Sequence, residues 1–242
     1  MELKSADQLT VVTDIFTRQA ELQDIMAGPG WRDKGFPFYR AIFREAAEVF
    51  DHLPWEWWKP GATLNDESRQ QAMLELTDIL CFGISDLLVL HKGAMMQHVA
   101  VGLSSALEGH PPYPAPFETA RGLEALRVAV ENLASKAVTN RRFYEGDLAL
   151  CYARLGYGPE MAYLYYYGKN ALNQFRQANG DKAGTYPRNW GGKPDNIHLA
   201  EIIETIGFVL TEADFMLMVT TNELIPHIYS RLQERYDQFP TP

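Results

Sequence analysis

Two pairs of acidic side chains are the residues of this sequence best placed to carry out chemistry. Glu45 and Glu48 lie three positions apart, and so do Glu75 and Asp78. On an α-helix this spacing puts both carboxylates of a pair on one face, where like charges repel by about 0.2–0.5 kcal/mol. Together the pairs offer four oxygen ligands of the kind that Mg²⁺ prefers. They therefore indicate a metal-dependent enzyme that acts on a phosphorylated substrate.

The helix that would carry the second pair favours a metal site over ordinary ion pairs. Apolar residues surround the segment 66–92 on nearly all sides, which is typical of a central, buried helix. Asp78 falls in the middle of an apolar arc of this helix, and a buried ionised carboxylate is costly unless a cation accompanies it. The alternative is a set of salt bridges to Arg44, Arg69 or a distant lysine. Two acidic pairs together favour the metal.

Such a metal site would supply both charge neutralisation and a nucleophile. Metal ions bound there would neutralise the phosphates of the substrate and lower the pKa of a bound water. Glu48 stands at the edge of the expected site and is the candidate general base for that water, with Glu45 as the second catalytic candidate.

A cationic segment completes the expected site. Lys169, Asn173 and Arg176 lie on one stripe of an expected helix, and a glycine-rich loop follows from residue 180. Between residues 169 and 193 a single acid accompanies five cations, namely Lys169, Arg176, Lys182, Arg188 and Lys193. Cations and backbone N–H groups in this arrangement can bind a triphosphate. The alternative is a solvated helix end, where the helix dipole favours cations.

A tryptophan cluster connects the two acidic helices. Trp55, Trp57 and Trp58 precede Lys59 within a short connector. These rings could stack on a nucleobase near the metal site, or they could cover the hydrophobic core.

Hydrophobic periodicity predicts an all-α protein, a compact multi-helix bundle forming one domain over residues 1–242. Proline and glycine mark loops at 28–30, 59–61, 109–116, 156–159 and 180–194. The helices expected between these breaks cover residues 5–27, 37–53, 66–92, 95–108, 118–138, 142–155, 159–179, 195–219 and 221–237.

Composition limits the partners and the compartment. The formal net charge of −9 disfavours a nucleic-acid or anionic-membrane surface. Cys81 and Cys151 belong to no metal-binding motif and no disulfide framework, which suits a reducing cytoplasm. No apolar run reaches the length of a membrane span, and the N-terminus lacks the layout of a signal peptide. We therefore expect a cytoplasmic protein.

The order of these motifs resembles the all-α nucleoside triphosphate pyrophosphatases, which include MazG-like enzymes. Within that superfamily the chain closely resembles the dimeric dUTPases of phages, some bacteria and protozoan parasites. Motifs that match lie between residues 23 and 196, and their core segments are Trp55–Lys59, Glu75–Ile79, Lys169–Gln177, Gly180–Tyr186, Trp190–Gly192 and Asp195–Asn196.

The resemblance implies roles for particular residues. Glu45, Glu48, Glu75 and Asp78 would bind Mg²⁺. The phosphates would be bound by Lys169, Arg176, Lys182 and Arg188. Asn173 would read the base, Gln23 and Trp57 would contribute to the uracil pocket, Lys59 would belong to the substrate-binding set, and Tyr186 and Asn196 would lie near the sugar or phosphates. The family cleaves dUTP and dUDP to dUMP as a homodimer, in which the second subunit helps to close each site.

Two departures from the family pattern concern base recognition. Cys81 occupies a position where the family usually has histidine, and Asp24-Ile25-Met26 follows Gln23 where an asparagine is often found. The same metal chemistry could therefore serve dCTP or a modified pyrimidine nucleotide. An alternative of another class is a helical homodimer that binds nucleotide without catalysis.

Overall fold

The structure is a computed structural model, and it describes residues 3–59, 63–91, 95–110 and 119–239. Parts of the loops expected at 59–61 and 109–116 lie outside the described residues, as do the expected helical residues 92 and 118. Along the described chain the elements are α1 (Ser5–Ala27), η1 (Trp31–Asp33), α2 (Phe38–His52), α3 (Asp66–Leu90), α4 (Met95–Glu108), α5 (Ala120–Asn140), α6 (Glu145–Arg154), α7 (Pro159–Ala178), η2 (Asp181–Ala183), β1 (Asn189–Trp190), β2 (Lys193–Pro194), α8 (Asp195–Val209), α9 (Glu212–Thr220) and α10 (Leu224–Tyr236). The predicted all-α class is confirmed.

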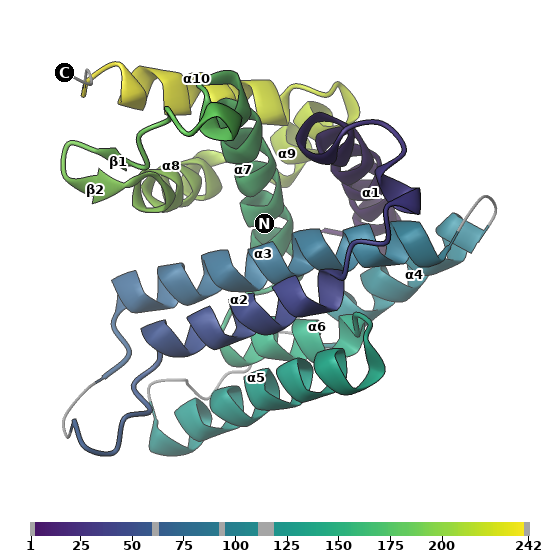
Figure 1. Ribbon diagram of the computed structural model, residues 1–242, viewed down its shortest axis with the longest axis vertical. Helices are drawn as coiled ribbons and strands as arrows, with labels where there is room; N and C mark the ends of the chain where they lie inside the picture. The colour runs from purple at the N-terminus through teal and green to yellow at the C-terminus, as the bar shows by residue number, and fades with distance from the viewer. Residues whose placement is uncertain (1–2, 60–62, 92–94, 111–118, 240–242) are drawn as a thin grey trace.

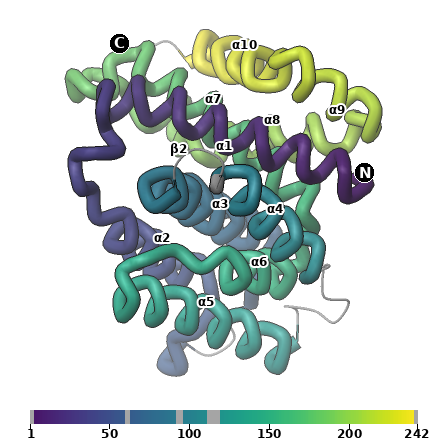
Figure 2. The backbone as a smooth tube through the Cα atoms, turned by 90° about the vertical axis from the view of Figure 1, so that its right-hand side faces the viewer, coloured from purple at the N-terminus to yellow at the C-terminus, as the bar shows by residue number. Residues whose placement is uncertain are grey.

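The helices pack in layers around α3. In Figure 1, α2 and α3 lie side by side, with α5 and α6 below them and α7 crossing behind α3. Figure 2 shows the same arrangement from the side, where α1 and α7–α10 cover one side of α3 and α5 and α6 lie on the other. The contacts of α3 with α1, α2, α6, α7 and α8 make it the central helix of the bundle.

Sequence explains why α3 takes this central position. Its N-terminus is fixed by Asn65, whose side chain accepts a hydrogen bond from the Ser68 N–H at 2.8 Å. Fifteen of its residues are buried, spread around the whole helix, as expected for a helix with apolar residues on every side. Cys81 and Cys151 are both buried and free.

The expected helix 195–219 is wrong, because the structure divides it into α8 and α9. The break lies at Leu210, and Thr211 starts the second helix with a capping box. Its side chain accepts a hydrogen bond from the Asp214 N–H at 3.2 Å, and the Asp214 carboxylate accepts one from the Thr211 N–H at 3.3 Å. These bonds satisfy backbone donors of a new first turn, so two shorter helices replace one long helix.

Removing this cap is expected to destabilise the protein modestly. Thr211→Ala loses the side-chain acceptor, which costs about 1 kcal/mol. Thr220→Ala, in the exposed last turn of the same helix, is the matched control and should change stability by less than about 0.5 kcal/mol. Urea unfolding of the two variants measures the difference, and equal midpoints would contradict the importance of the cap.

The expected loop 180–194 contains three short regular elements. Residues 181–183 form a 3₁₀ turn, and β1 and β2 form a two-stranded antiparallel hairpin in which Trp190 pairs with Lys193. Gly191 and Gly192 occupy its turn with φ of 55° and 86°. Positive φ at both central residues is the geometry of a type I′ turn, which favours glycine. The hairpin leads directly into Asp195, the first residue of α8.

Candidate active site

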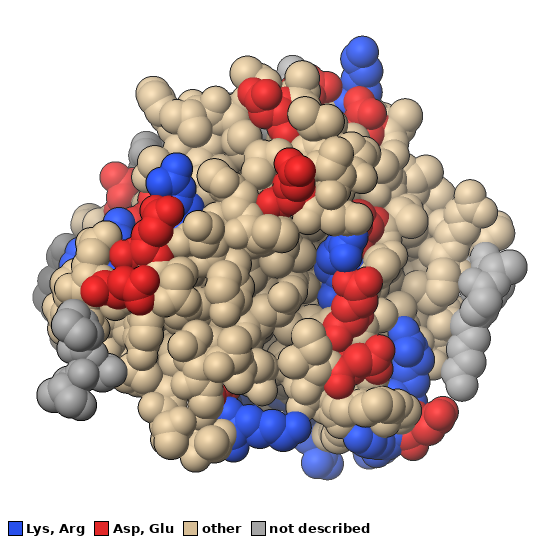
Figure 3. All heavy atoms as spheres, turned by 90° about the horizontal axis from the view of Figure 1, so that it is seen from above, with Lys and Arg blue, Asp and Glu red and all other residues tan. Residues whose placement is uncertain are grey.

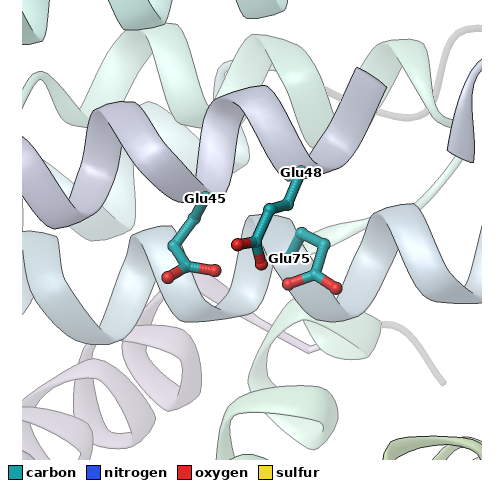
Figure 4. Close-up of side chains that lie close together, drawn as sticks. All are labelled: Glu45, Glu48 and Glu75. Atoms are coloured by element: carbon teal, nitrogen blue, oxygen red, sulfur yellow. The ribbon is translucent and has the colours of Figure 1, made fainter. Parts of the chain in front are cut away.

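Three carboxylates from two helices converge between α2 and α3. Glu45 and Glu48 extend from α2 towards Glu75 on α3, as Figure 4 shows. One oxygen from each residue lies within 4.8 Å of the others. The three-residue spacing on α2 brings Glu45 and Glu48 to one face, and the packing of α2 on α3 adds Glu75. The structure thus brings together three of the four expected metal ligands.

The environment of this cluster carries surplus negative charge. Burial, and next the charges of Asp78, Glu48 and Glu75, raise the pKa of Glu45 to about 8. Burial also acts to raise the pKa of Glu75, but a hydrogen bond from His52 and the charge of Lys169 outweigh it, so this pKa is lowered. Without a cation, Glu45 is therefore protonated near neutral pH while Glu75 stays ionised.

The donor set fits a hard divalent cation. All three convergent groups present carboxylate oxygens, which suit Mg²⁺ and similar ions. The proton on Glu45 relieves a repulsion that a divalent cation in the same position would relieve more strongly. The described residues near the cluster include one histidine, His52, whose Nε2 lies 3.5 Å from Glu75 Oε1.

This arrangement of charges predicts that pH changes both the stability of the folded protein and the extra stability that bound Mg²⁺ confers. The folded-state pKa of Glu45, about 8, lies above its ordinary value of 4.5. The contribution of protonated Glu45 to the free energy of unfolding is therefore fully present below about pH 4.5 and is lost as the pH rises towards 8. We expect the stability increment from added Mg²⁺ to grow over the same range, because the ion displaces the proton.

Thermal unfolding between pH 5 and 8, in EDTA and in Mg²⁺, measures this effect. Glu45→Gln should remove the pH-dependent part of the Mg²⁺ increment. Glu131→Gln, which replaces an exposed glutamate on α5, should follow the wild type. An Mg²⁺ increment that stays constant with pH in the wild type would contradict the assignment of the proton to Glu45.

Asp78, the fourth expected ligand, is held differently from the other three. Lys169 Nζ lies 2.6 Å from Asp78 Oδ2, and the Lys169 side chain is 1% exposed. Burial raises the pKa of Asp78, and the ammonium of Lys169 opposes that rise. In this structure a lysine distant in sequence satisfies Asp78, as the salt-bridge alternative described. Its role as a metal ligand remains a prediction.

A polar network continues from Lys169 along α7 and α8. Lys169 Nζ donates to Asn196 Oδ1 at 3.3 Å, and Arg176 donates to the same oxygen at 3.1 Å. Arg176 also lies 3.4 Å from Asn173 Oδ1 and forms a buried two-point ion pair with Asp195, at 2.8 and 2.7 Å. The structure therefore brings together four of the expected substrate-binding residues.

Asp195 is a residue of this network to which sequence reasoning assigned no role. Besides Arg176, its carboxylate accepts a hydrogen bond from the Tyr186 hydroxyl at 2.9 Å. Burial acts to raise the pKa of Asp195, but the hydrogen bonds from Arg176 and its positive charge outweigh burial, so this pKa is lowered. Asp195 thereby links Tyr186 to Arg176. Asp195 belongs to a segment that matches the family, but taken alone it resembles an ordinary acid in the first turn of a helix, and nothing in the sequence indicates its partner.

Other expected substrate residues do not reach the carboxylates in this structure. Arg188 pairs with Asp181, and Lys182 is exposed on η2. Lys59 pairs with Glu56 at 2.6 Å, and the Trp57 side chain is 85% exposed. Trp57 packs edge-on against Trp58, with ring centroids 5.4 Å apart. Stacking on a base by these tryptophans remains a prediction.

Gln23, a further expected substrate residue, lies at the interface between α1 and α3. It is buried, and its amide donates to the Ser85 hydroxyl at 3.0 Å. Ser85 is seven residues beyond Asp78 on α3, so the two lie on the same face of that helix about 10 Å apart.

The surface carries mixed charge on the face seen in Figure 3. Acidic and basic side chains lie intermingled there, between wide areas of other residues. None of the helices that the structure describes combines the length and apolar character that a membrane crossing needs.

Comparison with known proteins identifies the family. A search of curated proteins gave no match. The family model described as dUTPase matches residues 11–180, which is more than two thirds of the chain. The matched region contains both acidic pairs as well as Lys169 and Arg176, and it ends before Asp195. On the strength of this match, the chain belongs to the dUTPase family of dUTP-hydrolysing enzymes.

Proposed function

We propose that this protein hydrolyses dUTP, and also dUDP, to dUMP with Mg²⁺ held by Glu45, Glu48, Glu75 and Asp78. The observation that carries the proposal is the convergence of three carboxylates from α2 and α3 in a chain of the dUTPase family. The cationic residues of α7 lie beside them through the pair between Lys169 and Asp78. Acidic ligands next to cations match the two needs of a metal-bound polyphosphate.

Each part of the proposed mechanism belongs to a particular side chain. Bound Mg²⁺ supplies charge neutralisation and lowers the pKa of water. Glu48, whose side chain is one-third exposed and pairs with the exposed Arg44, accepts the proton of the attacking water. Lys169 and Arg176 neutralise phosphate oxygens, and Asp195 holds the Arg176 guanidinium in place.

The remaining assignments extend this proposal to the base, the assembly and the compartment. Gln23, Asn173 and Trp57 read or cover the base, while Lys59, Lys182, Tyr186, Arg188 and Asn196 complete the substrate site. The protein acts as a homodimer of one-domain subunits in the cytoplasm. These statements rest on the family resemblance and on the contacts of Gln23 and Asn196.

A nucleotide panel tests the proposed function. Wild-type protein in Mg²⁺ should convert dUTP to dUMP and pyrophosphate, and dUDP to dUMP and phosphate, faster than it converts dCTP, dTTP or UTP. Ion chromatography of the products separates these reactions. Faster turnover of dCTP would assign the same metal site to another base, and absence of any turnover would favour the non-catalytic nucleotide-binding alternative.

A further inference from the structure

One buried hydroxyl joins two glutamines of α1 to α3. The amide nitrogens of Gln19 and Gln23 both donate to Ser85 Oγ, each at 3.0 Å. Ser85 in turn donates to the Cys81 carbonyl one helical turn earlier, at 2.8 Å. Ser85 is completely buried, and the two glutamines are nearly so.

The single proton of the Ser85 hydroxyl determines the orientation of the Gln19 and Gln23 amides. A serine hydroxyl has one proton and two lone pairs. The proton is used on the Cys81 carbonyl, so Ser85 can accept from the glutamines but cannot donate to them. Each glutamine must therefore turn its NH₂ group towards Ser85 and its carbonyl oxygen away from it.

The two glutamine carbonyls then differ in their partners. Gln19 Oε1 lies 3.2 Å from the Tyr166 hydroxyl, whose single proton it shares with the Ile15 carbonyl oxygen at 3.0 Å, so both ends of this amide have polar partners within the protein. Gln23 Oε1 receives no hydrogen bond from the described residues, and it is absent from the fully buried side-chain atoms that lack a partner. Gln23 therefore presents a fixed acceptor that retains contact with solvent.

Gln23 contacts the same face of α3 that carries Asp78. Asp78, Cys81 and Ser85 follow one stripe of α3, at spacings of three and four residues. Gln23 meets that stripe about two helical turns from Asp78, or about 10 Å along the axis. Cys81 lies between them, with a short side chain. The proposed function assigns the phosphates to the end of this stripe at Asp78 and the base to the end at Gln23.

We propose that Ser85 is a positioning residue that sets the base preference of the enzyme by fixing Gln23 as an acceptor. This inference rests on the proposed function and deepens it. Uracil carries a proton on N3, between two carbonyl groups, whereas cytosine has an unprotonated acceptor at the same position. A locked Gln23 carbonyl accepts from N3–H of uracil and opposes N3 of cytosine. An amide free to rotate could serve either base.

The test compares the ratio of kcat/KM for dUTP to that for dCTP in wild type and Ser85→Ala. We expect the ratio to fall about ten-fold or more, chiefly through faster turnover of dCTP. Thr77→Val is the matched control, because Thr77 is an equally buried hydroxyl on α3 that donates to the Met73 carbonyl. Its ratio should stay at the wild-type value.

Adding Ser85→Ala to Gln23→Ala distinguishes a positioning role of Ser85 from general damage to the fold. In Gln23→Ala the ratio should already be low, and adding Ser85→Ala should not change it further, because Ser85 acts through Gln23. If Ser85→Ala does not fold, Ser85→Cys, which preserves the volume of the side chain but hydrogen-bonds weakly, gives the same comparison.

The outcomes distinguish this inference from the proposed function. Equal loss of turnover with both nucleotides in Ser85→Ala, at an unchanged ratio, would overturn the role of Ser85 while leaving dUTP hydrolysis intact. A wild-type protein that does not prefer dUTP would overturn the proposed function itself.

Discussion

Replacing Glu48 with glutamine is expected to lower kcat for dUTP hydrolysis by about 10²–10⁴-fold. Glutamine keeps the volume and an oxygen ligand, but it cannot accept a proton from water. Glu48 is the most exposed of the three convergent carboxylates, and its ion pair with Arg44 lies at the surface. It is therefore the group with the easiest access to an attacking water.

Asp51→Asn provides the matched control for this variant. Asp51 is an exposed acid on the same helix, one turn beyond Glu48, and its neutralisation should leave kcat within about two-fold of wild type. Circular dichroism should show equal helicity for both variants. If Glu48→Gln retains most of the wild-type kcat, another residue must accept the proton.

The second large effect is expected from Lys169→Met, which removes the partner of Asp78. The ion pair is short, the Lys169 side chain is 1% exposed and the Asp78 side chain 20% exposed, so loss of the lysine leaves a largely buried carboxylate without its partner. Breaking a buried pair in this way costs about 3–5 kcal/mol. For a chain of this size the melting temperature of the metal-free protein should fall by about 10 °C.

Two comparisons make this prediction specific to the buried pair. Lys193→Met breaks an exposed pair with Glu201, at 2.8 Å, and should cost less than about 1 kcal/mol. The double variant Lys169→Met/Asp78→Leu should recover much of the stability, because no unpaired charge remains. Differential scanning calorimetry in EDTA measures all three. A Lys169→Met protein that melts with the wild type would show that Asp78 has another source of compensation.

Sequence reasoning found the elements of the site because its signals were local. The three-residue spacing within α2 and within α3 determines which carboxylates share a face. The apolar surroundings of α3 correctly predicted its central position. The division between α8 and α9 also had a local signal, in the Thr211–Asp214 capping box, but the apolar pattern across residues 195–219 outweighed it.

Partners distant in sequence could not be predicted in the same way. Burial of Asp78 demanded a positive charge, and that demand is met equally by a metal ion or by Lys169, ninety-one positions further along the chain. Asp195 and Ser85 acquire their roles from the packing of α8 on α7 and of α1 on α3. Neither residue belongs to a spacing pattern that would indicate its partner.

The most direct test of a metal-dependent dUTPase site is the turnover of dUTP as Mg²⁺ is added to protein stripped of metal with EDTA. Formation of dUMP should be undetectable without the ion and should rise to saturation as Mg²⁺ is restored. Full turnover in EDTA, with no response to added Mg²⁺, would contradict the assignment of Glu45, Glu48, Glu75 and Asp78 as metal ligands.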